Sequence, residues 1–139
     1  MIRKEPISMI MTTPVVTLTK NDSLEKAEHL FKKNHIRHIP IVENDKIIGM
    51  LSHNDILRLS FSDYAGDFDG DMDAPVYNMF SINHIMTRNV VTISSSNSIK
   101  DVAEIIASKE FHALPVISHK KLIGIVTTTD LIKYLLKQF

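Results

Sequence analysis

Two short polar clusters in this sequence carry side chains that can bind a ligand. Residues 52–55 (Ser-His-Asn-Asp) and 127–130 (Thr-Thr-Thr-Asp) each follow an apolar segment and stand where a helix is predicted to begin. Hydroxyl groups and backbone N–H groups at a helix N-terminus favour a phosphate, and an aspartate can accept two hydrogen bonds at once. The same residue types are also common helix caps, so capping alone is the alternative interpretation.

The composition limits the classes of function. The 139 residues suit one compact domain or two small ones, and 16 Lys and Arg balance 16 Asp and Glu, unlike the basic excess of a nucleic-acid binder. The absence of cysteine excludes disulfides, zinc–thiolate sites and thiol nucleophiles. The N-terminus does not read as a signal peptide, and no apolar run approaches the roughly 20 residues of a membrane helix. We therefore expect a cytoplasmic protein that binds neither nucleic acid nor membrane.

The chain contains an internal repeat. A shift of 75 positions, which places Ile10 on Ile85, aligns the two halves without a gap. The matching segments are "IMTTPVVTL" with "IMTRNVVTI", "RHIPIV" with "HALPVI", and "KIIGMLSHNDIL" with "KLIGIVTTTDLI". Two copies of about fifty residues make a tandem pair, not a solenoid. We predict repeats at residues 7–60 and 82–136, joined by an acidic linker at 61–81.

Each repeat has the same order of predicted elements, β-α-β-β-α. The segment "VVT" is interpreted as a strand, Asp22 and Asn97 as helix N-caps, and Glu25 as the partner in a capping box. A helix, two strands joined at the turns "ENDK" and "SHKK", and a second helix follow. Gly49 and Gly124 are expected to serve backbone geometry. The apolar positions at helical spacing are Leu24, Ala27, Leu30 and Phe31, and Ile99, Val102, Ile105 and Ile106.

The size of the repeat predicts how the two copies pack. A unit of about fifty residues buries its own sheet poorly, so a second copy is needed to cover it. We predict a mixed α/β (α+β) fold in which the two β-α-β-β-α repeats form a pseudo-two-fold pair with their sheets face to face.

Two metal-site interpretations fail on spacing. The segment "DFDGDMD" at 67–73 is similar to a calcium loop, but its sixth position is Met72, not Gly, and its twelfth is Asn78, not Glu. The histidines lack the i, i+4 pair of a helical zinc site. We predict no metal site and a solvated, extended linker. The sequence also shows no Gly-rich phosphate loop and no Ser/His/Asp arrangement, so we predict that the protein is not an enzyme.

The "IMT…VVT" opening, the apolar-Pro-apolar strand and the closing "G-h-h-S/T-x-x-D" together resemble the CBS domain, whose tandem pair is called a Bateman module. The resemblance covers residues 7–60 and 82–136. It implies a stand-alone, non-catalytic sensor that requires no cofactor and binds an adenosine-containing ligand: AMP, ADP, ATP or S-adenosylmethionine. It also implies a homodimer. Because no effector domain is visible, we expect its output to pass through an unidentified effector protein.

The resemblance further implies which residues bind the ligand, because each cleft in that family draws on both repeats. An aspartate would accept the ribose hydroxyls, neighbouring hydroxyls would face the phosphate, and the strand would support the base. We expect the cleft at Asp130 to be the stronger, because the other has an amide at Asn54 and lacks a counterpart of Arg37. One predicted cleft combines Thr127, Thr129 and Asp130 with Thr12, Val16, Arg37, His38, Ile39 and Pro40. The other combines Ser52, Asn54 and Asp55 with Thr87, Val91, His112, Leu114 and Pro115.

The sequence leaves two other functions open. The first is a dimerisation scaffold whose clefts are empty or vestigial, which an adenine nucleotide that raises the melting temperature would exclude. The second is a small enzyme that uses the linker as a lid, which would turn over a nucleotide. The last predicted helix carries an apolar set that we expect to be buried in a symmetric dimer. This set is Leu131, Ile132, Leu135 and Leu136.

Overall fold

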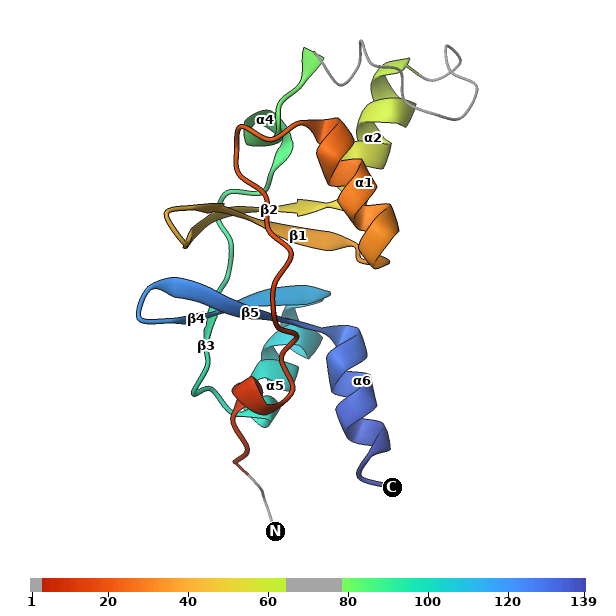
Figure 1. Cartoon of the computed structure of the whole chain (residues 1–139). Coiled ribbons are helices and arrows are strands. Elements are labelled where there is room, and N and C mark those ends of the chain that lie inside the picture. Colours follow the sequence, from red (N-terminus) through yellow and green to blue (C-terminus); the bar gives the residue numbers. More distant parts are fainter. Residues whose placement is uncertain (1–3, 65–78) are drawn as a thin grey trace. The chain divides into compact units, whose positions relative to one another are not determined.

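The computed structural model describes residues 4–64 and 79–139 (Figure 1). Most of the predicted linker, including the calcium-like segment at 67–73, lies outside the described residues. The chain divides into two compact units. The first unit is Val16–Val90, and the second unit is Met1–Val15 together with Val91–Phe139. The beginning of the first repeat therefore packs in the same unit as most of the second repeat.

The first unit is built on a β-hairpin. Strands β1 (His38–Glu43) and β2 (Lys46–Ser52) pair antiparallel, and both residues of the turn between them, Asn44 and Asp45, have positive φ. Two such residues define the turn type whose twist matches the strands it joins. Helices α1 (Leu24–Asn34) and α2 (His53–Tyr64) cover one face of this hairpin, and the short α4 (Ile82–Ile85) completes the unit (Figure 1). Its core is Leu18, Leu24, Ala27, Phe31, Ile39, Ile41, Leu51, Ile56, Ile82 and Met86.

The second unit repeats this plan. Strands β4 (Ala113–Ser118) and β5 (Lys121–Thr127) pair antiparallel, and the short β3 (Ile93–Ser94) pairs parallel with β4. Helices α5 (Ile99–Lys109) and α6 (Thr128–Leu136) and the 3-10 helix η1 (Ile7–Met9) complete it. Its core is Ile7, Ile93, Ile99, Val102, Ile106, Leu114, Val116 and Val126. The mixed α/β fold class predicted from the repeat is confirmed.

The predicted first strand of each repeat was wrong. Val15–Thr17 and Val90–Thr92 belong to no strand. Sheet pairing begins just after them, with Leu18 bridged to Ile41 in the first unit and with β3 in the second. The reason is burial: Leu18 and Ile93 are the side chains that enter the two cores, and they fix where the chain meets the sheet.

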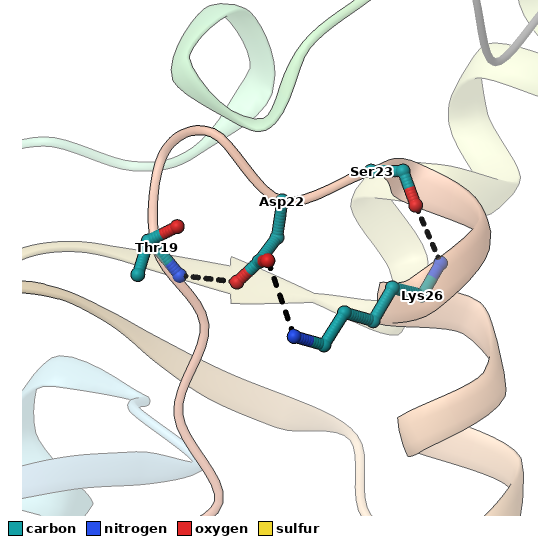
Figure 2. A network of polar contacts seen from close by, with 4 residues as sticks. All are labelled: Thr19, Asp22, Ser23 and Lys26. Atoms are coloured by element: carbon teal, nitrogen blue, oxygen red, sulfur yellow. Dashed lines mark hydrogen bonds and ion pairs between the residues drawn. The ribbon is translucent and has the colours of Figure 1, made fainter.

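The predicted helix caps were each one residue too early. Ser23 and Ser98 are the N-caps of α1 and α5, and their hydroxyls accept the backbone N–H three residues on. The Asp22 carboxylate instead accepts the Thr19 backbone N–H at 2.7 Å and the Lys26 ammonium at 3.1 Å, as Figure 2 shows. Because the cap is Ser23, Glu25 stands one position short of the capping-box place, and the predicted box is absent.

Each hairpin is joined by a segment that is distant in sequence. Thr12 and Ile125 exchange backbone hydrogen bonds of 2.7 and 3.2 Å in the second unit. In the first unit, Thr87 and Met50 exchange two backbone hydrogen bonds, each of 2.9 Å. The approach is close enough that a Cβ on Gly124 would lie 2.5 Å from the Met11 sulfur. A Cβ on Gly49 would collide with the Met86 sulfur. Both glycines therefore serve backbone geometry, as predicted, because a side chain at either position would meet the adjoining segment.

Candidate ligand-binding site

The Asp130 carboxylate closes a reciprocal capping box at the start of α6. The Thr127 backbone N–H donates to Asp130 Oδ2 at 2.9 Å, and the Asp130 N–H donates to Thr127 Oγ1 at 3.3 Å. Thr127 ends β5 and is also the N-cap of α6. The strand and the helix are thus held at a fixed angle by one aspartate, and the capping interpretation of this cluster is confirmed.

A second donor reaches the same carboxylate from the N-terminal segment. The Thr12 hydroxyl lies 3.1 Å from Asp130 Oδ1 and 3.2 Å from Oδ2. Thr12 is held there by its backbone bridge to Ile125 on β5. The structure therefore brings together three predicted site residues, Thr12, Thr127 and Asp130. Thr129 lies exposed in the first turn of the same helix.

The Asp55 cluster repeats the box with fewer donors. The Ser52 N–H donates to Asp55 Oδ2 at 2.9 Å, and the Asp55 N–H donates to Ser52 Oγ at 3.1 Å. Thr87, the counterpart of Thr12, is bridged to the neighbouring Met50. Within residues 4–64 and 79–139, no hydrogen bond joins its hydroxyl to Asp55, and Asp55 Oδ1 has no donor. The two carboxylates thus differ in how many acceptor positions are taken.

The strand residues of the predicted clefts have unequal access to a ligand. Ile39 and Leu114 are 0% and 1% exposed and belong to the two cores, so a ligand would reach only their main chain. Arg37 and His112, which precede the strands, are exposed. Pro40 and Pro115 are buried, Val16 and His38 are half-buried, and Val91 and Asn54 are exposed.

The predicted clefts take residues from both units. Thr12, Thr127, Thr129, Asp130, Val91, His112, Leu114 and Pro115 belong to the second unit, and Val16, Arg37, His38, Ile39, Pro40, Ser52, Asn54, Asp55 and Thr87 belong to the first. The grouping of residues from the two units around one ligand stays a prediction.

One hollow lies where the sequence indicated no site. It is lined by residues from the end of α1 to the start of α2 and has a volume of about 280 Å³. The lining residues are Phe31, Lys32, His35, Ile36, Arg37 and His53. Only Arg37 was among the predicted site residues. The available signal was the density of basic residues around the end of the helix, which is also typical of a solvated helix C-terminus.

The described residues do not suggest other classes of site. Within the two described ranges, no group of three or more His, Asp or Glu residues is placed to hold a metal ion. None of the helices in those ranges has the length and apolar character required to cross a membrane.

The chain folds into two repeats of strands and helices. In each repeat, a helix begins directly after the second hairpin strand, and an aspartate completes the capping box at its start. This arrangement defines a tandem module. The CBS domain profile matches residues 7–62 and 82–137. The chain therefore belongs to the CBS domain family, and the match falls on both copies of the internal repeat.

Relatives of known sequence support this assignment. The CBS domain-containing protein YhcV of Bacillus subtilis is 30% identical over 87% of this chain and 79% of its own length. Uncharacterized protein MJ1404 of Methanocaldococcus jannaschii is 33% identical over 93% of this chain. The chain spans only 31% of the length of MJ1404 and 47% of that of MJ1225, another relative from the same organism.

Solved structures share the fold over nearly the whole chain. The CBS domain pair of protein MJ0100, in complex with 5′-methylthioadenosine and S-adenosyl-L-methionine, superposes with a TM-score of 0.79 at 25% identity. This match covers 99% of this chain and 100% of that one. MJ1225 of Methanocaldococcus jannaschii superposes with a TM-score of 0.82 at 27% identity, over 95% of this chain and 48% of its own.

Proposed function

We propose that the chain is a non-catalytic regulatory module that binds an adenosine-containing ligand: AMP, ADP, ATP or S-adenosylmethionine. The observation that carries the proposal is the half-buried aspartate at the start of α6, fixed by its capping box and flanked by hydroxyl groups. The MJ0100 pair, which shares the fold, is in complex with two adenosine derivatives. A ligand of this class fits the acceptors and donors that the cluster presents.

The chemistry of the cluster suits a ribose bearing a phosphate. In the proposed complex, the two ribose hydroxyls donate to the Asp130 carboxylate, a charged contact stronger than one to a neutral acceptor. The Thr127 and Thr129 hydroxyls and the N-terminus of α6 face the phosphate. Because Thr12 donates to the same carboxylate, its hydroxyl either turns to the ligand as a donor or is displaced by it.

The Asp55 cluster is the second proposed site. Its carboxylate is oriented by the same capping box, and its Oδ1 atom has no donor within the described ranges. A ribose hydroxyl would therefore bind there without displacing a protein group. Asn54 in place of a hydroxyl residue weakens the phosphate end, so the ranking of the two sites depends on the phosphate content of the ligand.

The signal would pass through assembly with a second chain. The end of α6 exposes Ile132, Leu135 and Leu136, with exposed fractions of 56%, 54% and 66%. An apolar set of this size suits a symmetric dimer contact, whose geometry would then respond to ligand binding at the other end of the same helix. An unidentified effector protein would read that change.

A dimerisation scaffold is the alternative, and one observation favours it. Asp55 and Asp130 each have a structural role in a capping box, and Thr12 already donates to the Asp130 carboxylate. A thermal-shift series with AMP, ADP, ATP, S-adenosylmethionine, NAD and GTP separates the two functions. The sensor predicts that at least one adenosine-containing ligand raises the melting temperature and gives saturable heat in calorimetry. If none does, the scaffold replaces the sensor.

A further inference from the structure

The hollow between α1 and α2 is unusually basic for this neutral chain. We call the hollow lined by Phe31, Lys32, His35, Ile36, Arg37 and His53 the basic hollow. Its floor is apolar: Phe31 is buried, and its ring centroid lies 5.3 Å from that of His53, with a tilt of 48°. This contact holds the His53 imidazole in place. The other polar groups are exposed around it.

The second repeat shows that the fold does not require these basic residues. The corresponding backbone is the same in both copies: His35 and Glu110 are left-handed helix C-caps, with φ of 53° and 57°. The N–H that follows the second hairpin strand donates to the carbonyl group of Arg37 at 2.9 Å in one copy and of His112 at 3.1 Å in the other. At the matching positions of the basic hollow, the second copy has Ile106, Ala107, Glu110, Phe111, His112 and Thr128.

The two copies differ in charge at the residues that line the basic hollow. Lys32, His35 and His53 of the first copy are replaced by Ala107, Glu110 and Thr128 in the second. The apolar lining residues stay apolar. Since the second copy keeps the helix cap and the backbone hydrogen bond with other residues, neither feature requires the basic set.

We propose that the basic hollow binds the phosphate group of a small anion. Within the described ranges, the Arg37 guanidinium has no carboxylate partner, whereas the Lys32 ammonium lies 3.0 Å from Glu28 Oε1. A free guanidinium offers two parallel N–H donors, the arrangement that matches a phosphate. The imidazoles of His35 and His53 add further donors beside it. Lys32 supplies positive charge that Glu28 partly offsets.

This site goes beyond the proposed function, because it lies wholly within the first unit and shares with that function only Arg37. Two sources of phosphate fit the same chemistry: a free phosphate ion and the phosphate of a nucleotide. They are separated by titrating the full chain with inorganic phosphate, AMP and unphosphorylated adenosine.

Amide NMR spectra of the ¹⁵N-labelled chain give the test. Inorganic phosphate, added against sodium chloride of equal ionic strength, should shift the amide signals of His35, Arg37 and His53 saturably. Three variants should weaken this binding by about tenfold or more, because each removes a donor to a charged group: Arg37→Ala, His53→Thr and His35→Glu. The last two introduce the residue types that the second copy carries on the same backbone, so they are expected to fold.

A matched control lies in the other unit. His119 is an exposed histidine with a left-handed φ of 51°, as in His35, but it lies in the turn between β4 and β5. His119→Glu makes the same change of charge and should leave phosphate binding unchanged. The proposal is overturned if phosphate causes no saturable shift in the parent, or if His119→Glu weakens binding as much as His35→Glu.

The two proposals can fail separately. If nucleotides bind in a manner that depends on Asp130 or Asp55 while phosphate leaves the basic hollow unmoved, this inference is wrong and the proposed function stands. If phosphate binds at the basic hollow and no adenosine-containing ligand binds anywhere, this inference stands and the proposed function is wrong. When AMP, but not adenosine, shifts the signals of the basic hollow, the nucleotide is the source of the phosphate. When only inorganic phosphate shifts these signals, the source of the phosphate is the free ion or another phosphorylated molecule.

Discussion

The Thr12 hydroxyl donates to both oxygens of the Asp130 carboxylate, at 3.1 and 3.2 Å, across 118 positions of sequence. One turn further along α6, the Tyr134 hydroxyl donates to Glu5 Oε2 at 2.6 Å. Asp130 and Tyr134 are four residues apart and so lie on one face of the helix. The N-terminal segment, anchored by Ile7 in the core of the second unit, therefore holds α6 at two points.

The first prediction concerns the Thr12 contact. Thr12→Val keeps the shape of the side chain and removes the hydroxyl donor, so we expect the free energy of unfolding to fall by about 1 kcal/mol. Thr87→Val is the matched control, because Thr87 has the same backbone bridge but no hydrogen bond to Asp55 within the described ranges. Urea denaturation measures both. Equal losses in the two variants would show that the Thr12–Asp130 contact contributes nothing to stability.

The second prediction concerns the two aspartates. Asp130→Ala removes both acceptors for the ribose, so we expect nucleotide affinity to fall by about one to two decades, equivalent to roughly 1.5–3 kcal/mol. Asp55→Ala should cost less affinity for phosphate-bearing ligands, because its cluster has Asn54 in place of a hydroxyl residue. Each variant should also lose about 1 kcal/mol of stability with its capping box, and Asp130→Ala about 1 kcal/mol more with the Thr12 contact. Calorimetric titration at a temperature where all three proteins are folded makes the comparison. A parent-like affinity in Asp130→Ala, with binding lost in Asp55→Ala, would reverse our ranking.

The third prediction concerns the two glycines. A Cβ on Gly49 would meet the Thr87 carbonyl oxygen at 3.0 Å as well as the Met86 side chain, whereas the three atoms nearest to a Cβ on Gly124 all belong to the Met11 side chain. Because a backbone group yields less readily than a flexible side chain, Gly49→Ala should destabilise more, within the roughly 1–3 kcal/mol typical of overpacking.

Second-site variants test the same explanation. Adding Met11→Ala to Gly124→Ala should cost less than the two separate losses summed, because the shortened side chain no longer meets the new Cβ. Adding Met86→Ala to Gly49→Ala should recover less, because the Thr87 carbonyl group remains in contact. Thermal unfolding of the single and double variants gives these coupling energies. Strict additivity in both pairs would contradict the explanation.

The fourth prediction concerns pH. The Thr19 backbone N–H and the Lys26 ammonium lower the pKa of Asp22 below its ordinary value. A lowered pKa in the folded state means that the ionised carboxylate stabilises the fold. This contribution is complete above the unfolded pKa of about 3.9 and is lost as the pH falls through the folded pKa.

Asp22→Asn, which introduces the residue type found at Asn97, keeps the acceptor without the charge. Between pH 5 and the acid range, the free energy of unfolding of this variant should therefore change less with pH than that of the parent. The difference should be about the contribution of one titrating carboxylate. Parallel stability–pH curves would contradict the assignment.

The fifth prediction concerns assembly. Leu135→Glu places a charge in the exposed apolar set of α6 and should convert a dimer to a monomer at micromolar concentration, because the charge would lose water in the contact. Lys133→Glu changes the charge of an exposed residue two positions away and is the control for the charge change alone. Sedimentation velocity measures the mass of each protein. A parent chain that is monomeric under the same conditions would contradict the dimer.

The sequence by itself determined the elements whose signals are local. The spacing of Leu24, Ala27 and Phe31 indicated a helix with one buried face, and this face is in the core. The turns with residues 44–45 and 119–120 indicated hairpins, and the two clusters that end in Asp55 and Asp130 indicated helix starts. Each signal depends on residues within a few positions of one another, whose geometry is set mainly by helical or strand periodicity.

Only the tertiary structure decided which distant segments meet. No local pattern indicates that Thr12 joins β5 and reaches Asp130, or that Thr87 joins β2, since these contacts arise when separate segments share one core. The same reason explains the misplaced strands: "VVT" has the propensity of a strand, but Leu18 and Ile93 are the side chains that fill the cores and set the pairing. The basic hollow also needed the fold, because His53 reaches the end of α1 only through the hairpin that returns the chain beside Arg37.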